Sequence, residues 1–340
     1  MSRFLKVMIS TAVMSMTLST IAHAGFNIAP SDSTTDSYQT KMSPGETKIF
    51  KFKVFNQGKE RDEGVVYLSD QLTAPAGGLM YGKPGDVRKL AGAWASGDVV
   101  NATLEPGEVR EIAYSVTVPS ETKPGQYILL AVALRKNVGT VNTKAEINGQ
   151  MVGVSGPANT EEGKQIVIEI DKNNATHKIS IDQFAYDYDT TGKPTYLLSL
   201  SNKGTILEHP TFSVITKDSK GAEVERVSND KGLSFYHGTS EFQSLTGNKL
   251  LAPGTYTAEA VVSYSERTEK QQFTFSVSKQ EVSKAKEDLV ENKIDVTGVV
   301  DEPNTFQWIM QSGIILLLVI VLILLFSKKR KKKETYPNVE

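Results

Sequence analysis

The sequence lacks cysteine entirely, which excludes a structural disulfide, a thiol nucleophile, a zinc or iron–sulfur site with cysteine ligands and a lipid anchor on cysteine. Packing of side chains must therefore supply the stability of this 340-residue chain. The hydrophobic fraction of 39% rules out a wholly disordered protein and leaves room for two or three globular domains.

Histidine is almost as scarce. Three of the four histidines follow residue 24, namely His177, His209 and His237, and each is isolated, without the His-x-x-x-His spacing of a metal site. We expect them to be exposed or to lie in turns. The Gly-x-Ser-x-Gly pattern of a nucleophilic serine is also absent. The sequence therefore favours a protein that is not an enzyme, and it predicts no cofactor.

A basic surface is missing from the centre of the chain. Residues 25–307 carry a net charge of about −7, because the cations gather at the two ends. A protein that binds nucleic acid needs a stripe of Lys and Arg to neutralise phosphates, so nucleic acid is not expected as a partner.

The first 24 residues have the pattern of a secretory signal peptide. Two cations precede a mostly apolar run over residues 7–22, and the small residues Ala22 and Ala24 mark a cleavage site. A buried N-terminal helix is the alternative, but this apolar run has no polar face. We expect the mature chain to begin at Gly25. A disulfide-free exported chain fits a bacterium better than an animal secretory pathway.

The other end of the chain predicts a membrane anchor. Residues 308–326 form an apolar run that would span about 28 Å as a helix, close to the roughly 30 Å of a hydrocarbon core. Trp308 stands at the outer boundary of this segment. Six cations follow it within the tail 327–340, namely Lys328, Lys329, Arg330, Lys331, Lys332 and Lys333. This pattern predicts a single-pass protein of the cell membrane, with residues 25–307 extracellular and the C-terminus cytoplasmic.

Residues 302–306 lack the Leu and Gly of a sortase signal, so transfer to the wall is not expected.

Between these ends the sequence alternates with the period of β-strands. Phe50, Phe52 and Val54 alternate with Lys51 and Lys53, as in a strand with one packed face and one wet face. Similar runs occupy residues 65–68, 111–118, 127–134, 166–170, 196–200, 212–216, 256–264 and 272–277. This spacing predicts a mainly β protein with two tandem Ig-like β-sandwich domains, residues 25–172 and 176–278. Residues 279–307 are interpreted as a short helical or disordered stalk, with a docking helix as the alternative.

The two halves share an order of turns. Asn56 ends a strand in the first half and Asn202 ends one in the second. Later in each half a Pro-Gly pair opens a strand that begins near Tyr127 or Tyr256. Pro followed by Gly predicts a turn, and we expect the tyrosine after it to pin a corner between the sheets. The shared order suggests two related domains.

Few residues suggest a site. Asp187 and Asp189 stand two apart before Gly192, faintly like the start of a calcium loop, but position 198 is Leu where such a loop needs Glu. A hairpin turn is the favoured interpretation. Trp94 is the only tryptophan outside the predicted membrane segment, and its small neighbours could leave the ring exposed for stacking on a sugar. A core tryptophan is an equal alternative.

Several short motifs follow one another in a definite order along the chain. They include Ser43-Pro44-Gly45-Glu46, Gly78-Leu79-Met80-Tyr81, Leu104-Glu105-Pro106-Gly107-Glu108, Asn202-Lys203-Gly204-Thr205 and Leu251-Ala252-Pro253-Gly254. In this order they resemble the WxL-interacting proteins of Gram-positive bacteria over nearly the whole chain. The sequence departs from that family at Val118, Glu269 and Lys270, where the family usually has Met or Trp.

The resemblance implies an N-terminal domain that binds peptidoglycan and a second domain that binds host ligands, in a membrane-anchored partner of WxL-domain proteins. Trp94 and Tyr81 are the candidate ligand-binding residues. The leading hypothesis is thus a cell-surface binding or scaffold protein with peptidoglycan, WxL-domain proteins and host matrix proteins as partners. Two alternatives stay open. One is an enzyme acting on the wall, and the other is a chaperone that assembles surface polymers by strand addition, which requires an unpaired sheet edge.

Overall fold

The computed structural model describes residues 25–294 except 33, 76, 98 and 148–149, and for residues 137–158 it describes only the course of the backbone. The predicted signal peptide with Ala22 and Ala24, the predicted membrane segment that begins at Trp308, and the basic tail lie outside the described residues. Within the part that is described, no helix is both long and apolar enough to cross a membrane.

The chain divides into two compact units. The first contains the residues up to Leu72 together with Leu79–Thr176, and the second contains Thr73–Gly78 and the chain from His177 onward. Each unit closes its own hydrophobic core between two sheets. The prediction of a mainly β protein built from sandwiches is therefore confirmed.

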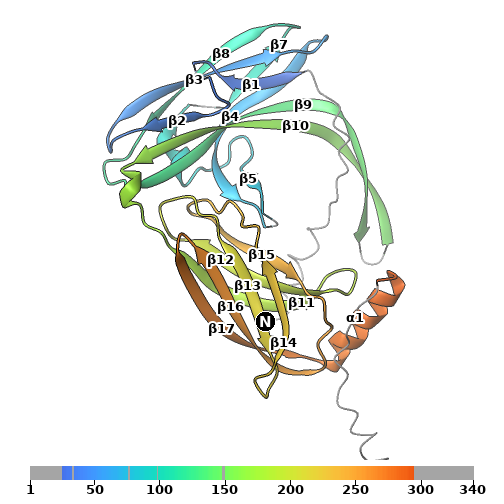
Figure 1. Cartoon of the computed structure of the whole chain (residues 1–340). Helices are drawn as coiled ribbons and strands as arrows, with labels where there is room; N and C mark the ends of the chain where they lie inside the picture. Colours follow the sequence, from blue (N-terminus) through green and yellow to red (C-terminus); the bar gives the residue numbers. More distant parts are fainter. Residues whose placement is uncertain (1–24, 33, 76, 98, 148–149, 295–340) are drawn as a thin grey trace, which may run out of the picture. The chain divides into compact units, whose positions relative to one another are not determined.

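The first sandwich is formed by strands from the first 170 residues (Figure 1). One sheet has the order β1-β3-β8-β6, and the other has the order β2-β10-β9-β4-β5, with β7 also paired to β4. The bounds are β1 Phe26–Pro30, β2 Tyr38–Lys41, β3 Thr47–Asn56, β4 Asp62–Thr73, β5 Leu79–Tyr81, β6 Ala95–Ser96, β7 Val100–Leu104, β8 Val109–Thr117, β9 Gly125–Ile147 and β10 Gln150–Ile170, with short 3-10 helices at Ala91–Trp94 and Lys172–Asn174.

The core of this sandwich accounts for the alternation in β3. Phe50, Phe52 and Val54 are at most 1% exposed and pack against buried side chains of β9 and β10, whereas Lys51 and Lys53 are exposed. Each such burial is worth about 1.5–3 kcal/mol, so a shift of one residue in the register of β3 would be strongly disfavoured.

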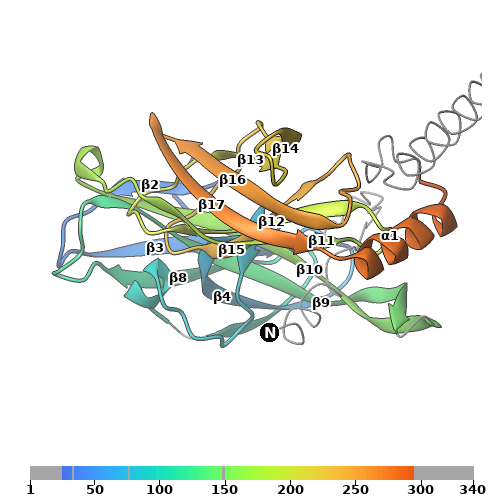
Figure 2. The ribbon, with the colours of Figure 1, turned by 90° about the horizontal axis from the view of Figure 1, so that it is seen from below.

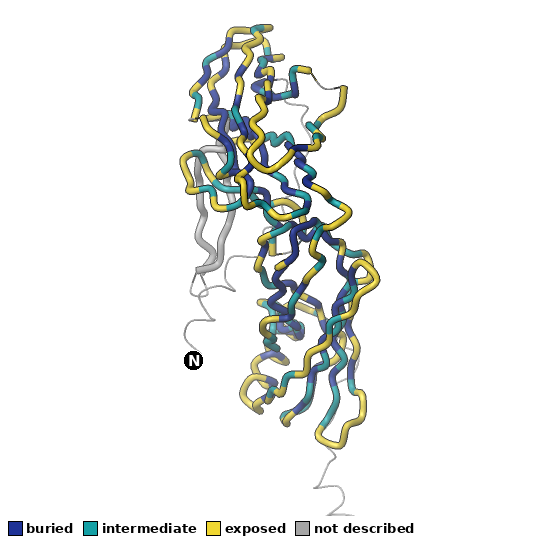
Figure 3. The backbone as a smooth tube through the Cα atoms, turned by 90° about the vertical axis from the view of Figure 1, so that its left-hand side faces the viewer, coloured by how far each residue is buried: buried dark blue, intermediate teal, exposed yellow. Residues whose placement is uncertain are grey.

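The second sandwich repeats this design. Its sheets have the orders β11-β12-β15 and β14-β13-β16-β17. The bounds are β11 Ile179–Tyr188, β12 Pro194–Asn202, β13 Thr211–Lys217, β14 Glu223–Asn229, β15 Ser240–Thr246, β16 Gly254–Tyr264 and β17 Arg267–Val277. Buried and exposed residues alternate along these strands (Figure 3), and Tyr196, Leu198 and Leu200 of β12 point into the core.

A helix follows the last strand. Helix α1, Lys279–Glu291, begins at Ser278, whose side chain and that of Glu281 form a capping box. Its residues Val282, Ala285 and Leu289 are buried, and the helix lies beside the end of β11 (Figure 2). For this part of the predicted stalk, the structure shows the docking helix that the sequence left open as the alternative.

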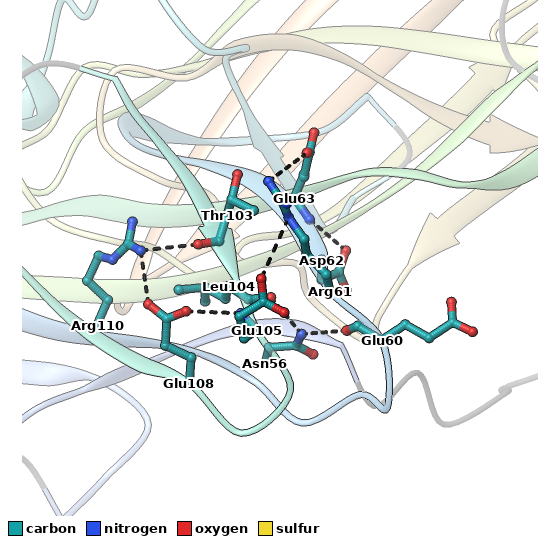
Figure 4. Close-up of polar contacts among 10 residues, drawn as sticks. All are labelled: Asn56, Glu60, Arg61, Asp62, Glu63, Thr103, Leu104, Glu105, Glu108 and Arg110. Carbon is teal, nitrogen blue, oxygen red and sulfur yellow. Dashed lines mark hydrogen bonds and ion pairs between the residues drawn. The ribbon is translucent and has the colours of Figure 1, made fainter.

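Asn56, at the end of β3, closes the turn that follows it (Figure 4). Its amide nitrogen donates to the carbonyl oxygens of Glu60 and Leu104 at 2.8 and 3.0 Å. Its side-chain oxygen accepts from the Gly58 nitrogen at 2.8 Å. Because Asn56 is only 1% exposed, all of these bonds replace contacts with water.

Asn202 makes the same set of bonds at the end of β12. Its amide nitrogen donates to the carbonyl oxygens of Ile206 and Phe235 at 2.9 and 2.8 Å, and its side-chain oxygen accepts from the Gly204 nitrogen at 3.0 Å. The recurrence of this clamp explains why both halves carry asparagine at this point.

The tyrosines after the two Pro-Gly turns also behave alike. The Tyr127 hydroxyl donates to the Lys123 carbonyl at 2.9 Å, and the Tyr256 hydroxyl donates to the Ala252 carbonyl at 2.8 Å. In each case the bond reaches back four residues and fixes the turn to the strand that follows it, as expected from the sequence.

Candidate functional site

Trp94 lies in the 3-10 helix Ala91–Trp94 and is partly buried against the core of the first sandwich. The centroid of its ring is 4.7 Å from that of Tyr127, with the planes tilted by 50°. This packing agrees with the alternative of a core tryptophan. A role in ligand binding stays a prediction.

Tyr81 lies in β5 and packs against a small cluster on the face of its sheet that points away from the main core. The cluster contains Val65, Tyr67, Leu130, Val132 and Leu134. Burial and a hydrogen bond to Glu161 raise the pKa of Tyr81 to about 12, so its phenol stays protonated near neutral pH. Since Trp94 and Tyr81 pack against different clusters, the structure does not join them into one site.

Asp187 and Asp189 lie at the end of β11 and in the turn that follows. One carboxylate oxygen of Asp189 accepts from the Thr191 nitrogen, the Thr191 hydroxyl and the Lys193 nitrogen at 2.7–3.0 Å. The Asp187 side chain accepts from the Tyr188 nitrogen at 2.8 Å. These bonds close the hairpin turn that the sequence favoured. In the described residues no group of three or more His, Cys, Asp or Glu side chains is arranged to hold a metal.

His177 and His237 each have a close polar contact. His177 Nδ1 lies 2.7 Å from a carboxylate oxygen of Glu208, and the other oxygen of Glu208 accepts from the Ser265 hydroxyl at 2.6 Å. The serine thus contacts the acid and not the imidazole, which differs from the order in a catalytic triad. Burial lowers the pKa of His237, whose Nδ1 lies 2.5 Å from the Gly204 carbonyl oxygen.

The strands β9 and β10 form a long hairpin, with 23 and 21 residues. Its two strands extend together beyond the other strands of their sheet (Figure 1). β4 pairs with β9 only as far as Arg135, and β2 pairs with β10 only over Ile166–Glu169. Residues 139–147 of β9 and 150–158 of β10 pair with each other. Among the strands that the structure describes, neither segment has a partner on its outer side. We call these two segments the ribbon.

Sequence reasoning missed the ribbon. It ended one alternating run at residue 134 and began the next at residue 166, whereas β9 continues to Ile147 and β10 already begins at Gln150. The polar and small residues there are those of an edge strand, not of a loop. The sequence did hold a signal: Asn148-Gly149 is the dipeptide most typical of a two-residue hairpin turn, and it follows an alternating run that ends at Ile147.

Three other sheet edges carry the usual protection against pairing with foreign strands. β17 has the charged residues Arg267, Glu269 and Lys270, β6 has two residues, and β1 ends at Pro30. On the ribbon, β9 carries Lys144 and Glu146.

The outer edge of β10 is less protected. No residue from 150 to 160 is charged. Pro157 and the register shift between Ala158 and Thr160 interrupt the edge at one end. Residues 150–156 are therefore an uncharged stretch of strand edge, whose outer backbone N–H and C=O groups have no partner strand in the described part of the chain.

Comparisons with known proteins give structural likeness alone. No family model matches the chain, and no curated protein matches it significantly. Among solved structures, a CsuC–CsuE chaperone–tip subunit complex from Acinetobacter baumannii is 14% identical with a TM-score of 0.31, covering 73% of this chain and 98% of that one. The CupB2 chaperone of Pseudomonas aeruginosa is 7% identical with a TM-score of 0.26, covering 71% and 97%. The class 5 fimbriae chaperone CfaA is 9% identical with a TM-score of 0.27, covering 72% and 98%.

These findings correct the predicted partners. The three structures named above are chaperones, one of fimbriae and one bound to a pilus tip subunit, and none is described as binding peptidoglycan, a WxL-domain protein or a host matrix protein. The partner prediction was therefore wrong. It rested on a resemblance of short turn motifs, and such turns serve any β-sandwich. The family resemblance itself stays a prediction.

Proposed function

We propose that this chain is an exported, non-catalytic protein that holds an extended segment of another exported polypeptide by strand addition at the outer edge of β10, as an assembly chaperone for surface polymers would. The observation that carries the proposal is the uncharged edge over residues 150–156, which has no outer partner among the strands that the structure describes. Export rests on the signal-peptide pattern of the first 24 residues.

The geometry of the edge supports reversible capture. An edge strand of this length offers about six backbone hydrogen bonds to an added strand, each worth about 0.5–1.5 kcal/mol net. Much of this gain offsets the ordering of the incoming segment, so backbone pairing alone gives weak, exchangeable binding. Such binding suits a protein that holds a polypeptide and then releases it.

A peptide titration tests the proposal. The probe is a fluorescein-labelled peptide, Lys-Val-Thr-Val-Thr-Val-Thr-Val-Lys, here called the Val–Thr peptide, and its binding to the purified chain is followed by fluorescence anisotropy. Methylating every backbone nitrogen removes all its N–H donors. Methylating alternate nitrogens leaves one edge of the peptide intact, because neighbouring residues point their N–H groups to opposite sides.

Strand addition predicts that the half-methylated peptide binds nearly as well as the unmodified one and that the fully methylated peptide binds at least about tenfold more weakly, since each lost bond costs about 0.5–1.5 kcal/mol. Equal binding of all three peptides would show that side chains alone mediate recognition and would refute the proposal.

A further inference from the structure

Helix α1 covers an apolar surface of the second sandwich. Its residues Val282, Ala285 and Leu289 are at most 5% exposed. Val282 and Ala285 belong to one hydrophobic cluster with side chains from the strands and loops beneath the helix. The buried residues that the sandwich contributes to this cluster are here called the helix floor, namely Leu250, Leu251, Tyr256 and Val277.

The helix is held on this floor mainly by apolar contacts. The side-chain hydrogen bonds described for Ser278, Glu281 and Asn292 stay within the helix and its caps. Apart from the three buried residues and the half-buried Asp288, every residue of α1 is exposed. A helix of 13 residues is marginal in water by itself. Because so few side chains attach it, α1 should open more readily than the paired strands of the sandwich.

The turn beside the floor brings the backbone of the helix close. Gly192, between β11 and β12, has no side chain, and a Cβ there would lie 2.4 Å from the Ala285 carbonyl oxygen and 3.0 Å from the Leu289 nitrogen. Ala285 itself is 1% exposed, so a larger side chain at its position would overpack the site. The site therefore fits a helix with a small residue between two aliphatic residues on one face, as in Val282, Ala285 and Leu289.

We infer that the helix floor is a docking site for an amphipathic helix, which α1 occupies in cis and which a helix of a partner protein occupies when α1 undocks. The fitting partner helix carries an aliphatic residue, a small residue three positions later and an aliphatic residue four positions after that, with polar residues on its other faces. Helix α1 itself shows this chemistry, because it is the helix seated on the floor. The inference is independent of strand addition at β10.

A helical peptide added in trans tests the inference. The probe has the sequence of residues 278–293 with a fluorescein label, and its binding is followed by fluorescence anisotropy. In the unmodified chain, α1 competes with the probe at an effective concentration on the order of millimolar, because it is tethered. Val282→Lys with Leu289→Lys, here called the undocked variant, turns two charges toward the floor and releases α1. We expect the undocked variant to bind the probe at least about tenfold more tightly than the unmodified chain does.

A matched chain and a matched peptide serve as controls. Ser283→Lys with Val290→Lys adds the same charge at exposed positions of α1, so this chain should bind the probe within about twofold of the unmodified chain. A peptide with Ala285→Leu should bind the undocked variant at least about tenfold more weakly than the probe does, since the larger side chain overpacks the site. Equal binding of the two peptides, or no binding of the probe to the undocked variant, would overturn the inference.

Hydrogen exchange on the unmodified chain keeps the inference testable should the undocked variant fail to fold. Backbone amides of α1 should exchange at least about tenfold faster than those of β12, the central strand of its sheet, because α1 opens while the sandwich stays folded. Equal exchange in α1 and β12 would show that the helix leaves the floor only on global unfolding, and would overturn the inference.

A second copy of this chain is the competing occupant, because each copy carries both an α1 helix and a helix floor. Sedimentation velocity on the purified chain distinguishes the two cases. A dimer of the unmodified chain that dissociates in the undocked variant would show that copies exchange their helices, and would overturn the inference of a separate partner. A monomer whose undocked variant binds the probe supports it.

Discussion

Gly192 couples the β11–β12 turn to helix α1, and replacing it with alanine should undock that helix. Gly192 has φ +86°, and an added Cβ would lie 2.4 Å from the Ala285 carbonyl oxygen and 2.9 Å from Leu289 Cγ. Gly221 offers a matched control, because it has φ +83° and nothing within 4 Å of an added Cβ. Both substitutions carry the cost of a left-handed backbone, about 1–2 kcal/mol. Only Gly192→Ala also forces α1 to move.

The extra cost can be worked out from what α1 buries. Val282, Ala285 and Leu289 are at most 5% exposed, and exposing the valine and leucine would cost up to about 3–6 kcal/mol. Since the helix can shift and not fully detach, we expect Gly192→Ala to lose about 2–4 kcal/mol more than Gly221→Ala.

Urea unfolding of the purified chain measures this difference, and trypsin gives an independent readout. Cleavage after Lys284 and Lys286 should be faster in Gly192→Ala than in Gly221→Ala. An undocked helix unfolds locally more often and so exposes its backbone to trypsin. Equal unfolding free energies and equal cleavage rates would refute the reasoning that α1 is part of the second sandwich.

Three further predictions concern packing and pH. Trp94→Ala should lower the unfolding free energy by about 2–4 kcal/mol, since the ring packs on Tyr127; an unchanged melting temperature would instead point to an exposed binding residue. Asn202→Ala should cost about 2–4 kcal/mol by leaving the Ile206 and Phe235 carbonyls without their donor, and urea unfolding that matches the unmodified chain would contradict this. Burial lowers the pKa of His237 below 6.5, so as pH falls through that value the unfolded chain binds a proton that the folded chain does not, and stability is lost. His237→Gln should flatten this loss between about pH 7 and pH 5 in thermal melts, and an unchanged slope would exclude His237 as its source.

Much of the fold could be predicted from the sequence, because a strand that buries one face alternates apolar and polar residues. The alternation of Phe50, Phe52 and Val54 predicts β3 and its core side together, and the recurrence of Asn56 and Asn202 marks equivalent turns. Each asparagine bonds the nitrogen of a glycine two residues further on, so the turn could be anticipated from the local sequence. The bonds to the Leu104 and Phe235 carbonyls join distant segments and could not.

The ribbon could not be anticipated in the same way. Its small and polar residues around Gly156 resemble a loop in composition, and the pairing that makes them a strand comes from β9, across a hairpin. Trp94 illustrates a second limit, because its contact with Tyr127 joins segments far apart in the chain. A site made of backbone groups leaves no side-chain motif, so the edge of β10 had no signature of its own beyond the hairpin turn.

Hydrogen–deuterium exchange with and without saturating Val–Thr peptide tests strand addition most directly. The account predicts that backbone amides in residues 150–156 of β10 exchange at least about tenfold more slowly when the peptide is bound, because pairing protects them from solvent, while the charged edge strand β17 is unchanged. Absence of protection in β10, or equal protection in β17, would contradict the claim that this chain captures polypeptides at the outer edge of β10.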